Sequence, residues 1–333
     1  MTRTTPPRPL DVVSLFPELA GRARTATRLH PRPGAPTVHD SSVGGPLLWP
    51  AGEDWPVCTG THRPYELTTL RDVRTRRRVL AQAWQRPRPP RTNLLTPDEQ
   101  AVIDRISAGY DLALLPAEPQ PLIPLAQLYA RDVPGLPCPD GMDLLQVLWC
   151  PFDEIMDSGA EVRLRWRRSG TVTDVPADPP EPAYIGNGDY VPEPCVLHPE
   201  RVVEYPAYHD LPEELAERVI ARERELLASP APDQPRYQGN LSVAPGWKVG
   251  GWAAFFTFRD PADPDELRCC GAPLEPLLTI ADEWDPDSIT WRPADEEGST
   301  ENNPTRVVIG RGYTLQVYRC TASSAHAPVT VMQ

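Results

Sequence analysis

The residues best suited to chemistry are two adjacent cysteines, Cys269 and Cys270, followed by Cys320 and His326. Thiolates and imidazoles are the ligands that tetrahedral zinc takes in proteins, so these four residues form a candidate metal site. Adjacent cysteines suit one ion poorly, because neighbouring side chains diverge. The alternative is that the cysteines are buried free thiols, which pack as small hydrophobic side chains. We therefore expect no cofactor, with zinc as the alternative.

A second group of chemically able residues is the run ADEWDPDSITW at 281–291. Its carboxylates, Glu283 and Asp285 among them, are groups that perform acid–base catalysis or bind a hard cation, and its two tryptophans could stack on a sugar or a base. Such runs are more often solvated loops anchored by aromatic side chains. No catalytic triad, P-loop or HExxH motif accompanies the run, so the sequence predicts no catalytic residue.

Three short segments occur twice in the same order, which predicts an internal duplication. They are VGG at 43–45 and 249–251, PLIPLAQL at 121–128 with PLEPLLTI at 273–280, and LQVLWC at 145–150 with LQVYRC at 315–320. The hexamers are predicted strands. In an extended chain alternate side chains point to opposite faces, so Leu145, Val147 and Trp149 share one face and Gln146, Leu148 and Cys150 the other.

The repeated glutamines, Gln146 and Gln316, lie among apolar neighbours. A buried amide must be hydrogen-bonded, so we expect both side chains to satisfy backbone groups at a strand end or a sheet seam. The functional alternative places them in a cleft between the two halves, where they would orient a ligand. The residues predicted to line that cleft are Gln127, Gln146, Gln316, Trp284, Asp285 and Trp291.

The remaining patterns predict turns and a few helices. The 44 prolines among 333 residues favour short strands over long helices. A capping box from Thr96 to Glu99 predicts a helix that begins at Pro97. The apolar spacing in 210–228 predicts a second helix, capped by Asp210. Ser169-Gly170 and Asn187-Gly188 are typical of hairpin turns.

The expected fold is mainly β, at the border with α+β, with two pseudo-repeated β-sheet halves and a few peripheral helices. The predicted division of the chain is an N-terminal helix and arm at 1–35, a first β half at 36–195 with a helical insertion at about 61–118, a connector helix and Pro-rich linker at 196–239, and a second β half at 240–333.

The charge balance limits the partners. A formal charge of −13 argues against a general affinity for nucleic acid or anionic membranes. The Arg-rich segment from Arg71 to Arg91 is the exception, and it is either a solvated face that pairs with acidic residues or a docking site for RNA or a phosphoprotein. The N-terminus lacks the apolar core of a signal peptide, so we expect a cytoplasmic protein.

Several segments, taken in order, resemble the YwqG-like family of uncharacterised bacterial proteins, in particular a long, Pro-rich actinobacterial branch. They are GGPLLWPAGEDWPVC at 44–58, PLIPLAQL, YVPEPCVLHPE at 190–200, CCGAPLEPLLTI at 269–280 and GRGYTLQVYRC at 310–320. The resemblance covers about 10 to 333. It implies a mainly β fold of two related halves and no established reaction. It also implies a C-x-x-C-G turn before the second PL segment, from which LRCCG departs.

These observations predict a cytoplasmic, non-catalytic protein that binds a protein or small-molecule partner. A duplicated fold would create a cleft between its halves, and no catalytic constellation is present. The alternatives are a zinc-dependent hydrolase that uses the Cys/His set with Glu283 or Asp285 as base, an RNA-associated factor, and, by analogy with the family alone, a toxin-neutralising immunity protein.

Overall fold

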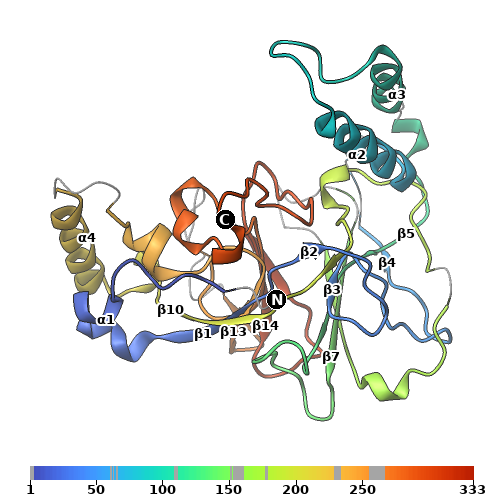
Figure 1. Cartoon of the computed structure of the whole chain (residues 1–333). Helices are drawn as coiled ribbons and strands as arrows, with labels where there is room; N and C mark the ends of the chain where they lie inside the picture. Colours follow the sequence, from blue (N-terminus) through green and yellow to red (C-terminus); the bar gives the residue numbers. More distant parts are fainter. Residues whose placement is uncertain are drawn as a thin grey trace.

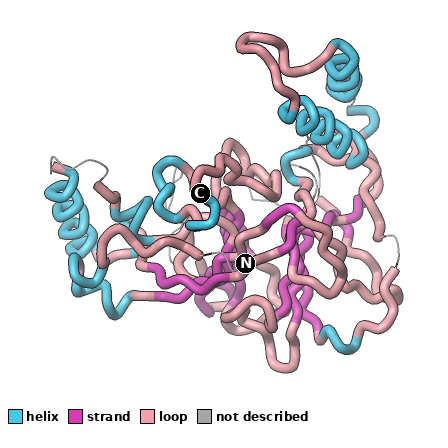
Figure 2. The backbone as a smooth tube through the Cα atoms, viewed as in Figure 1, coloured by secondary structure: helices cyan, strands magenta, loops and turns pink. Residues whose placement is uncertain are grey.

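Two antiparallel β-sheets form the centre of the computed structural model, and helices lie at its periphery (Figures 1 and 2). The described residues form fifteen strands, so the predicted mainly β architecture, bordering on α+β, is confirmed. The structure describes residues 4–60, 62, 64, 67–108, 112–150, 152, 161–176, 179–228, 234–254 and 267–333.

The first sheet has the strand order β2-β9-β3-β6-β7-β8, and a separate two-stranded sheet pairs β4 with β5. The bounds are β2 Arg32–Pro33, β3 Ser42–Val43, β4 Val57–Cys58, β5 Gln120–Pro121, β6 Ile123–Tyr129, β7 Leu144–Trp149, β8 Val162–Arg167 and β9 Cys195–Val196.

The second sheet has the order β10-β1-β11-β13-β14-β15, with β12 paired to β13. The bounds are β1 Arg24–Arg28, β10 Glu200–Glu204, β11 Lys248–Gly250, β12 Arg268–Cys269, β13 Ala272–Ile280, β14 Leu315–Cys320 and β15 Val329–Met332.

The two sheets share one pairing register, as an internal duplication requires. In the first sheet Gln146 pairs with Gln127, and the β6–β7 ladder shifts between Pro124 and Ala126. In the second sheet Gln316 pairs with Thr279, and the β13–β14 ladder shifts between Pro276 and Leu278. These positions correspond in the repeated segments, so the repeats encode the same strands with the same irregularity.

The sheets exchange strands at two short crossovers. β1 lies in the second sheet and β2 in the first, although only residues 29–31 separate them; β9 and β10 are divided in the same way by residues 197–199. The backbone N–H of His198 donates to the carbonyl of Leu29, which joins the crossovers. Segments outside the two predicted halves therefore complete both sheets.

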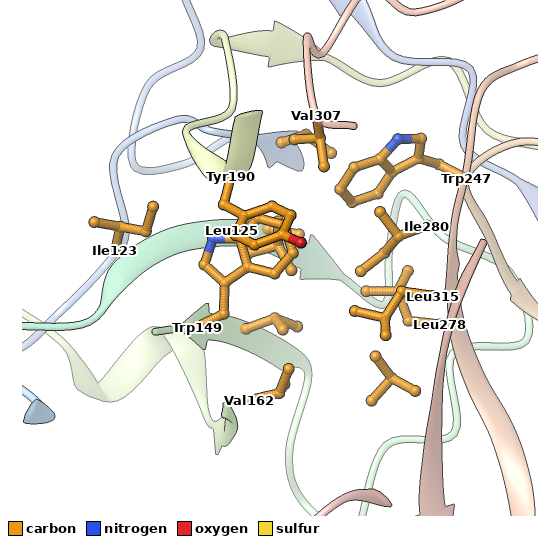
Figure 3. Close-up of a cluster of buried hydrophobic side chains, with 14 of the residues drawn as sticks. Ile123, Leu125, Trp149, Val162, Tyr190, Trp247, Leu278, Ile280, Val307 and Leu315 are labelled. Atoms are coloured by element: carbon orange, nitrogen blue, oxygen red, sulfur yellow. The ribbon is translucent and has the colours of Figure 1, made fainter. Parts of the chain in front are cut away.

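The main core lies between the facing sheets. On β7 the predicted alternation is confirmed, because Leu145, Val147 and Trp149 belong to this core whereas Leu148 and Cys150 pack on the opposite face. The shared core includes Leu125, Trp149, Tyr190, Trp247, Leu278, Ile280 and Leu315 (Figure 3). Each sheet also carries a smaller apolar cluster on its outer face, around Leu148 in the first sheet and Tyr318 in the second.

The helices lie at the two ends of the molecule (Figure 1). α2 and α3 stand at one end, and α1 and α4 at the other. None of the helices among the described residues has the length and apolarity needed to cross a bilayer. The bounds are α1 Val12–Leu15, α2 Leu70–Gln85, α3 Pro97–Ser107 and α4 Glu213–Leu227, with short 3₁₀ or π turns η1 Pro17–Arg22, η2 Leu112–Leu114, η3 Ser169–Thr171, η4 Gly188–Tyr190, η5 Tyr208–Asp210, η6 Tyr237–Ser242, η7 Pro286–Trp291 and η8 Ala294–Glu296.

The caps and turns predicted from local sequence patterns are confirmed only in part. The capping box of Thr96 and Glu99 is present at the start of α3, as predicted. The predicted cap at Asp210 is wrong, because α4 begins at Glu213 with Pro212 in the cap position and Asp210 ends η5. The two predicted hairpin turns are wrong as well. Short 3₁₀ turns, η3 and η4, stand at Ser169-Gly170 and directly after Asn187, and the side chain of Asn187 caps η4.

A candidate metal centre and an acidic pocket

The hairpin between β12 and β13 brings the adjacent cysteines to one site. Cys269 pairs with Ala272, so Cys270 and Gly271 form a two-residue turn. Both turn residues have positive φ, +46° for Cys270 and +83° for Gly271, as a type I′ turn requires. Cys270 therefore leaves the alternation of an extended strand, and its side chain need not diverge from that of Cys269.

Cys320 and His326 complete the cluster from the end of β14 and the loop after it. Nδ1 of His326 lies 3.3 Å from Sγ of Cys269 and 3.3 Å from Sγ of Cys320, and the Sγ atoms of Cys270 and Cys320 are 3.8 Å apart. All four donor atoms lie within 4.8 Å of one another. The sequence-based argument that adjacent thiols suit one ion poorly assumed an extended backbone at Cys270, which the turn does not have.

These separations suit a tetrahedral zinc ion. With Zn–S bonds of about 2.3 Å and Zn–N bonds of about 2.0 Å, tetrahedral geometry places two sulfurs about 3.8 Å apart and a sulfur and a nitrogen about 3.5 Å apart. Three thiolates and one imidazole would fill all four positions of such an ion. This is the class of site that holds structural zinc, since catalytic zinc keeps one position for water or substrate.

The thiols differ in acidity. The hydrogen bond with His326 lowers the pKa of Cys320 to about 6. Burial, followed by the hydrogen bond with Cys320, raises the pKa of Cys269 to about 11. A bound cation would favour the thiolate form of each, because metal binding displaces protons from its ligands.

An acidic pocket of about 430 Å³ lies between the connector segment at 196–239 and the second half. Trp284 and Asp285 line it, as do Asp282, Glu223 and Arg236. Two of its carboxylates have partners within the protein: Asp285 accepts from the backbone N–H of Ser288 at the start of η7, and Glu223 accepts from the hydroxyl of Tyr208. Burial, together with the charges of Asp285, Glu283 and Glu301, raises the pKa of Asp282 to about 6.

The predicted cleft residues do not form one site. Trp284 and Asp285 line the acidic pocket, whereas Trp291 is buried and donates from Nε1 to the carbonyl of Gly239. The three glutamines are fully buried within the sheets. Their amides are used internally, for example from Nε2 of Gln146 to Oε1 of Gln127 at 2.9 Å and from Nε2 of Gln316 to the carbonyl of Leu278 at 3.1 Å. Their assignment to a ligand cleft is therefore wrong, and the structural interpretation holds.

Sequence reasoning missed most of the pocket wall. Asp282 stands in the acidic run but was not assigned to the cleft, and Glu223, Arg236 and Tyr208 belong to the segment interpreted as a connector. No local pattern identifies them, because residues far apart in the chain line the same cavity.

Glu283, a predicted base, is unsuited to catalysis. It is 1% exposed, and its Oε2 lies 2.8 Å from Nδ1 of His30. The second ring nitrogen of His30 lies 3.3 Å from Glu200. The carboxylate is therefore part of a buried charge cluster at the strand crossovers.

The Arg-rich segment forms α2 and its C-terminal extension, and several of its guanidinium groups pair with acidic residues. Arg77 lies 3.0 Å from Glu193, Arg74 lies 2.7 Å from Glu181, and both terminal nitrogens of Arg86 contact the carboxylate of Glu99. These pairs favour the solvated, internally paired face over a nucleic-acid site.

Comparison with known proteins gives no match to any family model or to any curated protein. The YwqG-like resemblance therefore stays a prediction that rests on its motifs.

Proposed function

We propose that this protein is a non-catalytic binding protein that binds a small organic cation in the acidic pocket. We also propose that a zinc ion stabilises its second half. The observation that carries the binding role is the imbalance of charge in the pocket. Asp282, Asp285, Asp287 and Glu223 face one arginine, Arg236. A cationic ligand would restore the balance.

Asp282 is the group we assign as the counter-ion of the ligand. It forms no ion pair with any residue that the structure describes, and its electrostatic neighbours are all acidic. A partly buried carboxylate without a cation is costly, so a ligand that supplies one gains that free energy on binding. Trp284 and Tyr313 also line the pocket, and aromatic rings attract cations; the guanidinium of Arg292 already lies 5.3 Å from the centre of the Trp284 ring.

The proposed zinc ion rests on the four converging donors. The site sits where the β12–β13 turn meets the end of β14, so an ion there would tie the turn to the loop that carries His326. None of the seven cysteines, all of which the structure describes, forms a disulfide, which fits the reducing cytoplasm that we propose as the compartment.

Titration calorimetry with putrescine and tetramethylammonium, against the neutral probe 1,4-butanediol, tests the ligand class. We expect heat from at least one cation and none from the diol. Asp282→Asn should weaken cation binding by about tenfold or more, the effect of losing one charge-assisted contact. Asp98→Asn removes an equal charge from an exposed position on α3 and should leave binding unchanged. Equal affinity in wild type and Asp282→Asn, or heat from no cation, would overturn the proposal.

A zinc hydrolase is the second candidate, favoured by one observation. A cavity of about 510 Å³ adjoins the metal site and is lined by Cys320, His326, Ser323 and Ser324. Hydrolysis of activated esters by the zinc-loaded protein, abolished in His326→Ala, would support this reading. Four protein ligands would leave the ion no position for water or substrate, which argues against this second candidate.

A further inference from the structure

A second cluster of metal-binding residue types lies in the first half. The donor atoms of Cys58, His62 and Cys150 all lie within 4.8 Å of one another, and Sγ of Cys150 is 3.9 Å from Nδ1 of His62. Oε2 of Glu161 lies 2.9 Å from Sγ of Cys58. The two thiols and the imidazole thus converge on one point, and the carboxylate of Glu161 contacts one of the thiols.

This cluster occupies the position that corresponds to the Cys/His site of the second half. Cys58 pairs with Gln120 on β5, and Cys269 pairs with Ala272 on β13. Gln120 and Ala272 each stand directly before the repeated PL segment. Cys58 is therefore the structural counterpart of Cys269, although no local sequence similarity indicates it.

The second cysteine of each cluster also occupies corresponding positions in the two halves. Cys150 and Cys320 are the last residues of the repeated hexamers, which pair in the same register with β6 and β13. These two cysteines of each half thus belong to the apolar cluster on the outer face of its sheet. The duplication conserves two ligand positions, and the remaining ligands are supplied locally in each half.

The local ligands differ because the turns differ. In the second half two residues join the paired strands, and one of them is Cys270. In the first half the connection between β4 and β5 is the long segment that includes α2 and α3. His62 stands at the start of this segment, and Glu161 directly precedes β8.

The surroundings hold these side chains in place. Cys58 and Cys150 are 1% and 2% exposed. The ring of His62 stacks on Phe152, with centroids 4.2 Å apart, and Arg163 contacts the other oxygen of Glu161 at 2.5 Å. Fixed, largely dehydrated ligands with supporting contacts are the condition for a tight metal site.

We propose that Cys58, Cys150 and His62 bind a second zinc ion, which fastens the base of the helical insertion to β7, and that Glu161 supports this site through its contact with Cys58. Its thiolate and imidazole ligands are types that zinc accepts. The comparison between halves rests on the zinc proposed above, but the two sites share no ligand, so each can be tested without the other.

Elemental analysis and native mass spectrometry of protein purified without chelators test the assignment. We expect about two zinc ions per chain, falling to about one in Cys150→Ser and in His62→Ala. Cys320→Ser and His326→Ala should also retain about one, lost from the other site. Cys138→Ser changes a cysteine outside both clusters and should retain both. His62→Ala keeps both buried thiols, so it reports on the site should Cys150→Ser fail to fold.

Cobalt substitution separates the two sites by ligand type. In Cys320→Ser the remaining cobalt should show charge transfer from two thiolates, and in Cys150→Ser from three. Glu161→Gln should alter the cobalt spectrum of Cys320→Ser and leave that of Cys150→Ser unchanged. One zinc per chain that survives both Cys150→Ser and His62→Ala, and is lost in Cys320→Ser, would overturn the second site while leaving the proposed function intact. Absence of zinc from the wild type would overturn both sites.

Discussion

The ammonium group of Lys248 lies 2.6 Å from Oε1 of Glu204, and both side chains are fully buried. The same carboxylate accepts from the backbone N–H of Ala244 at 2.9 Å and of Trp252 at 2.8 Å. Lys248 is the only lysine in the chain. The pair joins β11 to β10 across β1, so it holds strands from three distant segments together.

Lys248→Met should destabilise the protein by about 3–5 kcal/mol, because it leaves the charge of Glu204 buried and unpaired. Burial lowers the pKa of Lys248, and the neighbouring Glu204 carboxylate opposes that shift. The double variant Lys248→Met, Glu204→Leu should recover most of the loss. Urea unfolding measures both. Removing the exposed pair of Arg222 and Glu225 should cost about 0.5 kcal/mol or less; a Lys248→Met loss of that size would contradict the prediction.

Gly251→Ala tests why the second VGG segment ends in glycine. A Cβ at this position would collide with the Glu204 carboxylate and lie 2.7 Å from Cβ of Ala26, at φ +75°. We expect a loss of about 2–4 kcal/mol from steric overlap and backbone strain. Gly298 has φ +86° with open space around it, so Gly298→Ala isolates the strain alone, about 1 kcal/mol. Equal losses in both variants would show that the contact with Glu204 does not matter.

The crossover charge cluster predicts acid sensitivity. Burial alone would raise the pKa of Glu283, but the charge of His30 and the nearby arginines hold it below the ordinary 4.5. A depressed carboxyl pKa contributes stability above the unfolded pKa and loses it as pH falls through the folded value. The free energy of unfolding of the wild type should therefore decrease as the pH falls below about 4.5. Glu283→Gln should lower stability at pH 7 by about 3–5 kcal/mol and flatten this acid limb. An unchanged slope of unfolding free energy against pH would refute the assignment.

Asp282 predicts the opposite pH dependence. Its pKa rises from 3.8 to about 6 on folding, chiefly through burial, so folding favours the protonated form. The stability that this proton confers is present below pH 3.8 and is lost as pH rises through 6. Asp282→Asn should therefore be about 1–2 kcal/mol more stable than wild type at pH 7, with the advantage vanishing near pH 4. Denaturant unfolding of wild type and Asp282→Asn at pH 7 and pH 4 tests this prediction. If the variant were less stable than wild type at pH 7, Asp282 would have a structural partner.

Zinc removal should destabilise the second half. Incubation with 1,10-phenanthroline should lower the melting temperature, because an ion that binds the folded state alone adds stability by mass action. Added zinc should restore the original value. His326→Ala should melt lower than wild type and lose part of its response to the chelator. A melting curve that the chelator leaves unchanged in the wild type would argue against bound metal.

Local patterns in the sequence determined the strands and their faces. The repeats predicted equivalent strands. The alternation of Leu145, Val147 and Trp149 with the residues between them predicted which face of the strand enters the core, because successive side chains in a strand point to opposite faces. The capping box at Thr96 was also predictable, since its two hydrogen bonds span three residues.

Only the tertiary structure decided where those strands pair and what their ends bring together. The strand exchange at 29–31 and 197–199, the pairing of Cys58 with Gln120, and the acidic pocket all join segments more than 50 residues apart, for which local sequence gives no signal. The adjacent cysteines show the same limit at short range. Their convergence depends on a positive φ at Cys270, which the β12–β13 pairing imposes and which the residue type by itself disfavours.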